Sequence, residues 1–477
     1  MIFPLIFAWL FLALPGQAAT INVVGCNGSA DHSKVQTAVD SATDGDTVQI
    51  PSGTCTFTGS VTWSNKAIIV QGAGIGVTNI TSNSQAAFDV TVTTEAGFRL
   101  TAMTINANAL NSEGAIEIDG QTMTGEIASR FRVDHILLNI DNGTGPRMMF
   151  VHGPVYGLID HLTFDYNGGD TVNGISVYAN MTSDTSYGGS TQNGSYACNN
   201  FAIDLGGSTA VYVEDSTFTH AWGTGNSGGI NDLNYCARMV FRYNTVTGPW
   251  HLQTHSTRGT DRGGIRSEYY NNSFNGNNDG LYTGPMVLRG GTGVIFNNTM
   301  LNMANCWWCQ QPKALLTDFQ RVPNTGCTVS SPPLNTVTGS NPADGRIEAN
   351  GWPALDQPGW VGPQAAQTNV PIYLWNNGAQ VGCSTGGACN GDWNDIYLNC
   401  EGDGNVGAKM EDFVKTTVHS NGAKDYCSGT TSMPGSCGTH TNTYVPYTYP
   451  HPLQGGADTT PPSVPTGVTI GLLQGER

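Results

Sequence analysis

The sequence predicts an all-β solenoid, a fold in which the chain winds through many similar turns. Three observations support this prediction: an octet of residues that recurs along the chain, a low content of charge, and a high content of glycine. Charged residues make up 12% of the 477 residues, and 62 residues are glycine. An ordinary domain has about 25% charged residues and about 7% glycine. Because long solvated helices need more charge, this composition favours short strands joined by turns.

The N-terminal segment, residues 1–19, is predicted to be a signal peptide. It holds an apolar run, MIFPLIFAWLFLALPG, followed by small residues. No later stretch approaches the roughly 18 to 20 apolar residues that a membrane span needs. We therefore expect a secreted, extracellular protein without a transmembrane segment.

Twelve cysteines agree with an oxidising compartment, in which they can pair. The predicted disulfides are Cys26 with Cys55, Cys383 with Cys389, and Cys427 with Cys437. Only Cys306 and Cys309 have the spacing of a redox or zinc motif, and no second pair completes a tetrahedral zinc site. The cysteines therefore favour structural disulfides over metal binding.

The net charge of −17 argues against a nucleic-acid partner, because most of the surface would repel phosphates. The net charge does not argue against neutral glycans as ligands. An acidic polymer fits as a substrate only where basic residues are concentrated in one place.

The recurring octet starts at intervals of 26 to 33 residues, with one interval of 54 that equals two turns. Such a period is typical of solenoids. The third, sixth and eighth places are mostly apolar, and alternation breaks between the fourth and sixth places. This pattern predicts a strand, a tight bend and a second strand in each turn. The octets are FRLTAMTI (98–105), FRVDHILL (131–138), GLIDHLTF (157–164), VYVEDSTF (211–218), MVFRYNTV (239–246), SEYYNNSF (267–274) and GVIFNNTM (293–300).

Asparagine occupies the sixth place of three successive octets, as Asn244, Asn272 and Asn298. An inward amide must satisfy both its oxygen and its nitrogen, and stacked copies can bond the backbone above and below. We predict an asparagine ladder inside the solenoid. The eighth places should stack beside it as an apolar column formed by Phe164, Phe218, Val246, Phe274 and Met300.

Four further segments, 35–61, 351–360, 371–378 and 444–453, carry a resemblance to a known group. They read VQTAVDSATDGDTVQIPSGTCTFTGSV, GWPALDQPGW, PIYLWNNG and YVPYTYPHPL. With the octets, they resemble secreted bacterial right-handed parallel β-helix proteins of the pectate lyase-like group, which have the pectin lyase fold. The resemblance covers about residues 21–453.

The resemblance implies a short helix that caps the first turn and one β-helix domain over residues 20–453. The part from about 305 to 453, rich in loops, Cys and Trp, should form the C-terminal region. Residues 454–477 include ADTTPPSVPTGVT and are predicted to be a linker or a disordered tail.

A third strand is expected in each turn, just before the octets, in segments 114–120, 147–153, 173–180, 228–234, 250–256 and 285–291. Outward residues of these strands would form a groove along the rod, which suits an extended polymer. The candidate groove residues are Glu117, His152, Tyr178, Asp232, His255 and Arg289.

Basic residues concentrate near the end of this series. No lysine lies between Lys66 and Lys313, but ten arginines do, and six of them fall from Arg238 to Arg289. Six residues are predicted to bind the substrate: His152, Asp232, His251, Arg258, Arg262 and Arg266. This cluster points to an acidic polysaccharide.

The chemistry that fits such a cluster is β-elimination on a uronate polymer. That reaction needs a neutralised carboxylate, a base and help for the leaving oxygen. The segments WHLQTHS and PMVLRGG weakly resemble the alginate and chondroitin lyase branch of β-helix enzymes. By position, the resemblance assigns the base to His255 and the acid to Arg289, although that branch uses a lysine base. It also leaves Ca²⁺ open as a cofactor, while no matching cluster of acidic residues is found.

Other interpretations stay open. Arg262 and Arg266 could pair with nearby acids, Asp261 and Glu268, and serve only structure. His135 and His161 favour a stacked structural pair. Asn278-Asp279-Gly280 resembles the motif of β-helix hydrolases, with Asp232 as the partner carboxylate. The rival to an enzyme is a non-catalytic, glycan-binding or adhesive protein of the cell surface. In either case we expect a monomer that contacts extracellular polysaccharide.

Overall fold

The computed structural model describes most of the chain up to residue 455. The described residues are 18–83, 85–109, 113–122, 127–140, 147–166, 173–182, 195–220, 229–248, 250–255, 262–276, 286–301, 315–318, 356–363, 367–378, 396–399 and 422–455. Predictions on residues 1–17, Arg258, Asp261, Asn278-Asp279-Gly280, Cys306, Cys309, Cys383, Cys389 and the tail from 456 fall outside them. In the described part, no helix is long and apolar enough to cross a membrane.

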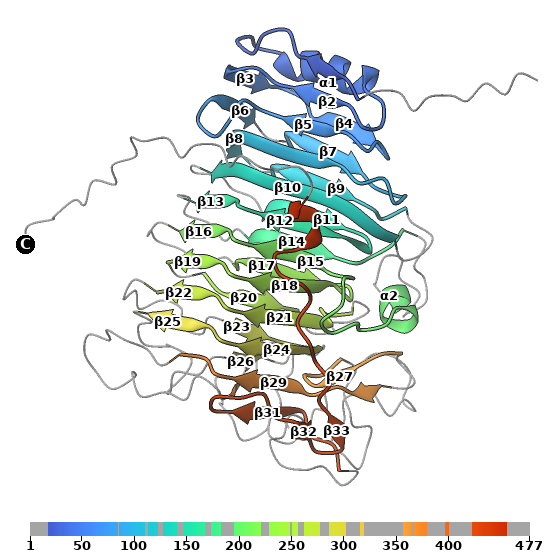
Figure 1. Ribbon diagram of the computed structural model, residues 1–477, viewed down its shortest axis with the longest axis vertical. Helices are drawn as coiled ribbons and strands as arrows, with labels where there is room; N and C mark the ends of the chain where they lie inside the picture. Colours follow the sequence, from blue (N-terminus) through green and yellow to red (C-terminus); the bar gives the residue numbers. More distant parts are fainter. Residues whose placement is uncertain are drawn as a thin grey trace, which may run out of the picture.

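The strands gather into two large sheets that run along the whole rod (Figure 1). The ten-stranded sheet contains β4 (Val61–Ser64), β7 (Phe88–Thr91), β9 (Ile116–Asp119), β11 (Arg147–His152), β14 (Asn173–Tyr178), β17 (Asn231–Asn234), β20 (Leu252–Thr254), β23 (Met286–Leu288), β26 (Leu315–Asp318) and β30 (Ile396–Asn399).

The nineteen-stranded sheet contains the remaining strands of the turns. They are β1 (Thr20–Asn22), β2 (Thr47–Gln49), β3 (Gly53–Phe57), β5 (Ile69–Gln71), β6 (Thr78–Asn83), β8 (Arg99–Ala109), β10 (Ile127–Ile140), β12 (Val155–Asp160), β13 (Thr163–Tyr166), β15 (Val211–Glu214), β16 (Thr217–His220), β18 (Arg238–Arg242), β19 (Thr245–Thr247), β21 (Arg266–Tyr270), β22 (Ser273–Asn275), β24 (Thr292–Phe296), β25 (Thr299–Leu301), β29 (Ile372–Trp375) and β31 (Tyr426–Gly429).

Every pairing within these two sheets is parallel and joins one turn to the next, as in β12 with β15 and β15 with β18. Because β12 and β15 pair directly, the interval of 54 residues between their octets is one turn, and its interpretation as two turns is wrong. The first strand of each octet pairs with the first strand of the next octet, and the second strand pairs with the second, as in β13 with β16. The long strands β8 and β10 run through the bend and pair on both sides of it. This arrangement confirms the prediction of a parallel β-helix. Two short hairpins, β27 (Trp360–Val361) with β28 (Thr368–Asn369) and β32 (Ser436–Cys437) with β33 (His440–Thr441), are antiparallel.

The bend inside each octet lies at its fifth residue, which adopts a positive φ. The angles fall between 49° and 62° at Ala102, His135, His161, Asp215, Tyr243, Asn271, Asn297 and, in one further turn, Asn376. This left-handed conformation turns the chain sharply, so that residues four and five both face outward. The predicted sequence of strand, bend and strand is confirmed.

The asparagine ladder is present and continues one step beyond the prediction. Asn272 Oδ1 accepts from the backbone N–H of Asn244 at 3.0 Å, and Asn298 Oδ1 accepts from that of Asn272 at 3.1 Å. Asn377 repeats the contact with Asn298 at 3.2 Å. Each Nδ2 also donates to a backbone carbonyl, such as Phe241 O from Asn272 at 2.9 Å. Beside the ladder, the predicted apolar column is at most 1% exposed.

Helix α1 (Asp31–Ser41) lies over the first turn and buries Val35 and Val39 against the core. The predicted disulfides Cys26–Cys55 and Cys427–Cys437 are present. A third, Cys198–Cys236, was not predicted and ties the short helix α2 (Ser195–Asn200) to the turn after β17.

The C-terminal segment from Tyr444 to the 3₁₀ helix η3 (Pro452–Gly455) runs across several turns of the nineteen-stranded sheet (Figure 1). We name residues 444–455 the strap. Arg242 donates to Tyr447 O at 2.6 Å and to Thr448 O at 2.7 Å, and Tyr444 donates to Glu268 Oε2 at 2.8 Å. The strap thus covers a set of buried charges on the outer face of that sheet.

Candidate active site

The outward face of the ten-stranded sheet carries two columns of side chains. The register pairs Glu117 with Phe150, Phe150 with Ser176, and Ser176 with Asp232. The second column contains His152, Tyr178 and Asn234 in register. The predicted groove residues thus lie on one face, as the alternation of strands requires.

His255 and Arg289 extend the second column by two further strands. Thr254 pairs with Leu288, so the residues that follow them, His255 and Arg289, leave neighbouring strands at the same level. Adjacent strands are about 4.8 Å apart. The fold therefore brings the predicted base and acid to consecutive turns of one outer wall.

His255 is held by a carboxylate on the preceding strand. Its Nε2 lies 2.7 Å from Asp232 Oδ1, and the His255 side chain is 28% exposed while that of Asp232 is 6% exposed. Tyr178, one strand further back, donates its phenol to Asp232 Oδ2 at 2.6 Å. Both oxygens of Asp232 are engaged, and His255 stands at the solvent end of this chain of contacts.

The electrostatics of Asp232 follow from these contacts. Burial alone would raise the pKa of Asp232, but the charge of His255 and the hydrogen bonds from His255 and Tyr178 outweigh burial and lower it. Burial, followed by the nearby charge of Asp232, raises the pKa of Tyr178. Tyr178 is thus a neutral donor and Asp232 an anion. With Asp232 opposite Nε2, the ring atom of His255 that can accept a proton is Nδ1.

Arg289 lies against the strand of His255. Its Nη1 donates to Gln253 Oε1 at 3.1 Å, and its backbone N–H donates to Thr254 Oγ1 at 3.0 Å. Burial, assisted by the charge of Arg289, lowers the pKa of His251 to about 4. His251 is therefore neutral near pH 7, and Arg289 supplies the positive charge.

A second cation, Arg147, approaches the same site from β11. Its guanidinium carbon is 3.8 Å from the centroid of the Phe150 ring and 5.1 Å from that of Tyr178. Its charge also contributes to the low pKa of Asp232. Arg147 therefore acts on Asp232, while Arg289 acts on His251 at the next strand.

Nearer the N-terminal end, the same face of the ten-stranded sheet carries acidic residues. Glu117 is 8% exposed, and burial, reinforced by Asp89, Glu113 and Asp119, raises its pKa to about 8. His152 Nε2 lies 3.4 Å from Glu117 Oε1, and burial lowers the pKa of His152 to about 3. His152 lies three strands from His255 and belongs to this separate cluster.

The residues around His255 do not fit a calcium ion. Calcium takes six to eight oxygen ligands, mostly carboxylates and carbonyls. Asp232 is the carboxylate beside His255, and both its oxygens already contact Tyr178 and His255. Within the described ranges, the group of three close metal-ligating side chains is Cys26, Asp31 and Cys55, in which the two cysteines form a disulfide.

Two predicted substrate-binding residues serve structure instead. Arg262 is completely buried and binds Asp356 with two contacts, Nε to Oδ2 at 2.5 Å and Nη2 to Oδ1 at 2.6 Å. Arg266 is also fully buried, and its Nε donates to Glu268 Oε1 at 2.7 Å. Neither guanidinium can reach a polymer in the groove, so these two predictions are corrected. The alternative of structural pairing holds for Arg266 with Glu268.

Sequence reasoning left Gln253 and Arg147 out of the site. Alternation along WHLQTHS places Gln253 on the same face as His255, and this signal could have identified it. Arg147 begins its strand, and nothing in the local pattern indicates that it leans over Phe150. Tyr178 was placed in the groove, but its bond to Asp232 depends on a residue 54 positions away.

No family model matches the sequence, and neither does any curated protein. Among solved structures, similarity is found to a mannuronic acid specific polysaccharide family 6 lyase from human gut microbiota, with 12% identity, 83% of this chain and 84% of that chain covered, and a TM-score of 0.39. An alginate lyase from Paenibacillus sp. str. FPU-7 gives 15% identity, 60% and 97% coverage and a TM-score of 0.33. The A-module of a mannuronan C-5 epimerase from Azotobacter vinelandii gives 14% identity, 87% and 99% coverage and a TM-score of 0.33.

Proposed function

We propose that the protein is a secreted lyase that cleaves a uronate-containing polysaccharide by β-elimination. The observation that carries this proposal is the buried Asp232 at 2.7 Å from His255, with Arg289 at the same level of the next strand. A base oriented by a carboxylate and a fixed cation on one face of a sheet are the parts that this reaction requires.

The roles follow from the atoms. His255 Nδ1 removes the proton from the carbon next to the carboxylate, the electron pair forms the new C=C bond, and the bond to the glycosidic oxygen breaks. Asp232 stabilises the imidazolium that results. Arg289 donates to the leaving oxygen, and Arg147 opposes the negative charge of the sugar carboxylate. Because arginine stays protonated at neutral pH, the proton that the leaving oxygen finally carries comes from the imidazolium or from water.

A direct test measures ultraviolet absorbance from unsaturated products on alginate, pectate and glycosaminoglycans. We expect activity on at least one of these polymers, and we expect His255→Ala to reduce kcat by about 10² to 10⁴. Arg289→Ala should lower it by about 10² or more. His32→Ala, on the capping helix, is the matched control and should leave kcat unchanged.

Circular dichroism and thermal unfolding check that each variant is folded. Activity that survives both His255→Ala and Arg289→Ala would place the reaction elsewhere. Absence of product on every polymer, with binding retained, would favour a glycan-binding protein without catalysis.

A further inference from the structure

A second concave site lies on the other large sheet, at the bend of the octets. Its cavity has a volume of about 530 Å³ and is lined by His161, Asp215, Ser216, Thr217, Tyr243, Thr245, Tyr449, Pro450 and Gln454. Three of these residues are the positive-φ corners of successive turns, and the last three belong to the strap. The cavity therefore forms only where the C-terminus crosses the repeat.

Two tyrosines make one wall of this cavity. The rings of Tyr243 and Tyr449 stack with centroids 3.6 Å apart and an interplanar angle of 22°. They are nevertheless 37% and 41% exposed, which places them among the most exposed large apolar side chains of the described residues. Rigid, exposed aromatic faces next to polar groups are typical of binding surfaces.

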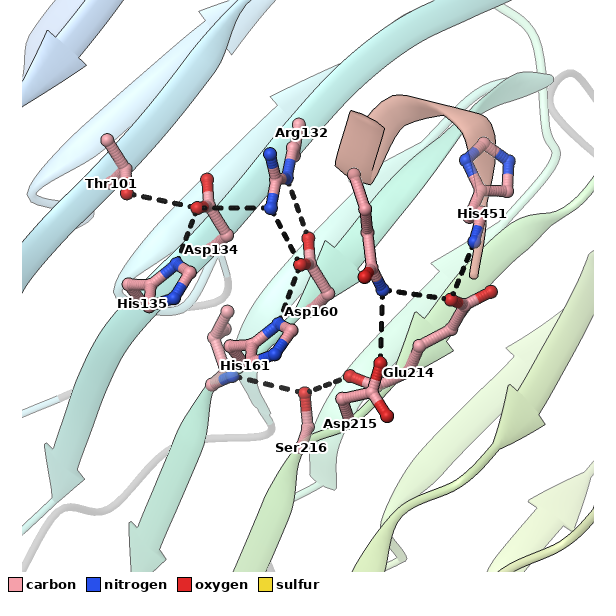
Figure 2. A network of polar contacts seen from close by, with 12 residues as sticks. Thr101, Arg132, Asp134, His135, Asp160, His161, Glu214, Asp215, Ser216 and His451 are labelled. Carbon is pink, nitrogen blue, oxygen red and sulfur yellow. Dashed lines mark hydrogen bonds and ion pairs between the residues drawn. The ribbon is translucent and has the colours of Figure 1, made fainter. Parts of the chain in front are cut away.

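The polar atoms opposite are fixed by their own neighbours. Tyr449 donates its phenol to Asp215 Oδ1 at 2.8 Å, and Gln454 donates to Asp215 Oδ2 at 3.1 Å. His161 Nδ1 contacts Asp160 Oδ2 at 2.8 Å, and its ring stacks on His135 at 4.8 Å (Figure 2). Its side chain is 43% exposed. Asp160 is itself held by two bonds from Arg132, at 2.9 Å each. Asp160, which is itself held by Arg132, thus fixes the orientation of the His161 ring.

A row of hydroxyls continues from the cavity along the rod. Thr163, Thr217, Thr245, Ser273 and Thr299 pair in register on successive strands. Thr217 and Thr245 lie in the cavity and are exposed, as is Thr299 beyond it. Hydroxyls therefore recur about every 4.8 Å along a straight line.

We propose that this cavity is a second carbohydrate-binding site, which takes a sugar ring of a polysaccharide chain. The apolar face of the ring lies on the Tyr243 and Tyr449 wall, and its hydroxyls bond Asp215, His161 and the two threonines of the row that line the cavity, Thr217 and Thr245. This site contains none of the groups assigned to β-elimination, and it binds without cleaving. The lyase groove and this site lie on different sheets, so one chain of polymer can be held while another is cut.

The test uses isothermal titration calorimetry with oligosaccharides of six residues built from mannuronate, galacturonate or β-1,4-linked glucose. The protein is the His255→Ala variant, in which turnover is reduced by about 10² to 10⁴. We expect one site more per chain in His255→Ala than in His255→Ala with Tyr243→Asn. Asparagine suits this position because Asn271 and Asn297 occupy the same positive-φ corner in the next turns. In the His255→Ala protein with Tyr243 intact, Thr245→Val should weaken the site at least tenfold, whereas the matched change Thr299→Val, outside the cavity, should not.

The three probes separate the possible sources of the ring. Binding of a uronate hexamer identifies an acidic polymer as the ligand of this cavity, and binding of the glucose hexamer alone identifies a neutral glycan. An unchanged number of sites and unchanged affinity in the Tyr243→Asn variant would overturn the proposal, as would failure of all three probes to bind at this face. Lyase activity of Tyr243→Asn on the hexamers should equal that of the parent protein, so loss of this site and loss of catalysis are read separately.

Discussion

At the residue scale, the proposed reaction gives Asp232 the role of orienting His255 rather than touching the substrate. It is buried, and it binds Tyr178 with one oxygen and His255 with the other. Asp232→Asn keeps the shape but removes the charge that stabilises the imidazolium. We expect kcat to fall about a hundredfold or more while KM changes less than about twofold.

A Tyr178→Phe variant serves as the milder comparison, because Asp232 keeps its contact with His255. It should lose less than about tenfold in kcat. Wild-type kcat in Asp232→Asn, or a rise of KM alone, would assign Asp232 to substrate binding or to structure.

The arginines show what a residue's neighbours in sequence can indicate and what they cannot. Arg266 and Glu268 are two positions apart, so their pairing could be weighed from the sequence. The partner of Arg262 is Asp356, 94 positions away, and it belongs to a segment whose place in the fold has no periodic signal. A guanidinium that is buried in this way is indistinguishable in sequence from one that faces a ligand.

At the element scale, the asparagine ladder shows why the repeat could be predicted. One period of sequence equals one turn, so an inward Asn must meet its counterparts above and below. Asn272 accepts from Asn244, donates to Asn298 Oδ1 at 3.0 Å, and donates to Phe241 O at 2.9 Å. Asn272→Ala removes these partners together and leaves buried backbone groups unsatisfied.

We expect Asn272→Ala to lower the free energy of unfolding by about 3 kcal/mol or more. Asn79→Ala is the matched control, since its amide makes an exposed contact to Gly76 O at 3.2 Å, and it should lose less than about 1 kcal/mol. Denaturant unfolding measures both. Equal losses in the two variants would mean that the ladder adds nothing beyond ordinary surface contacts.

At the scale of the whole molecule, the periodic parts were predictable and the closing parts were not. The bends, the ladder and the outward columns of the ten-stranded sheet all repeat with the octet. The strap does not repeat, yet it completes the second cavity and binds Arg242 from 205 positions away. The Cys198–Cys236 disulfide likewise joins a segment between octets to the rod. Contacts of this kind depend on the positions of non-repeating segments in the folded chain. The composition and the spacing of the repeats do not determine these positions.

Several buried histidines make the stability of the rod depend on pH. Burial lowers the pKa of His220, His251 and His451 to about 4 in each case, and that of His152 to about 3. The unfolded chain takes up these protons below about pH 6.5, whereas the folded chain does so only near pH 3 to 4. Their contribution is therefore present above pH 6.5 and is lost as the pH falls through that window.

His220 isolates this effect, because burial alone accounts for its shift. We expect thermal unfolding between pH 7 and pH 4 to show a smaller loss of stability in His220→Gln than in the wild type, by about 2 to 3 kcal/mol.

The stability contributed by His161 depends on pH in the opposite direction. Its bond to Asp160 raises its pKa against the effect of burial, so its contribution is present below pH 6.5 and is lost as the pH rises through its folded pKa. The His161→Gln variant should therefore differ from the wild type more at pH 5 than at pH 9, and parallel pH profiles for the wild type and both variants would contradict this account.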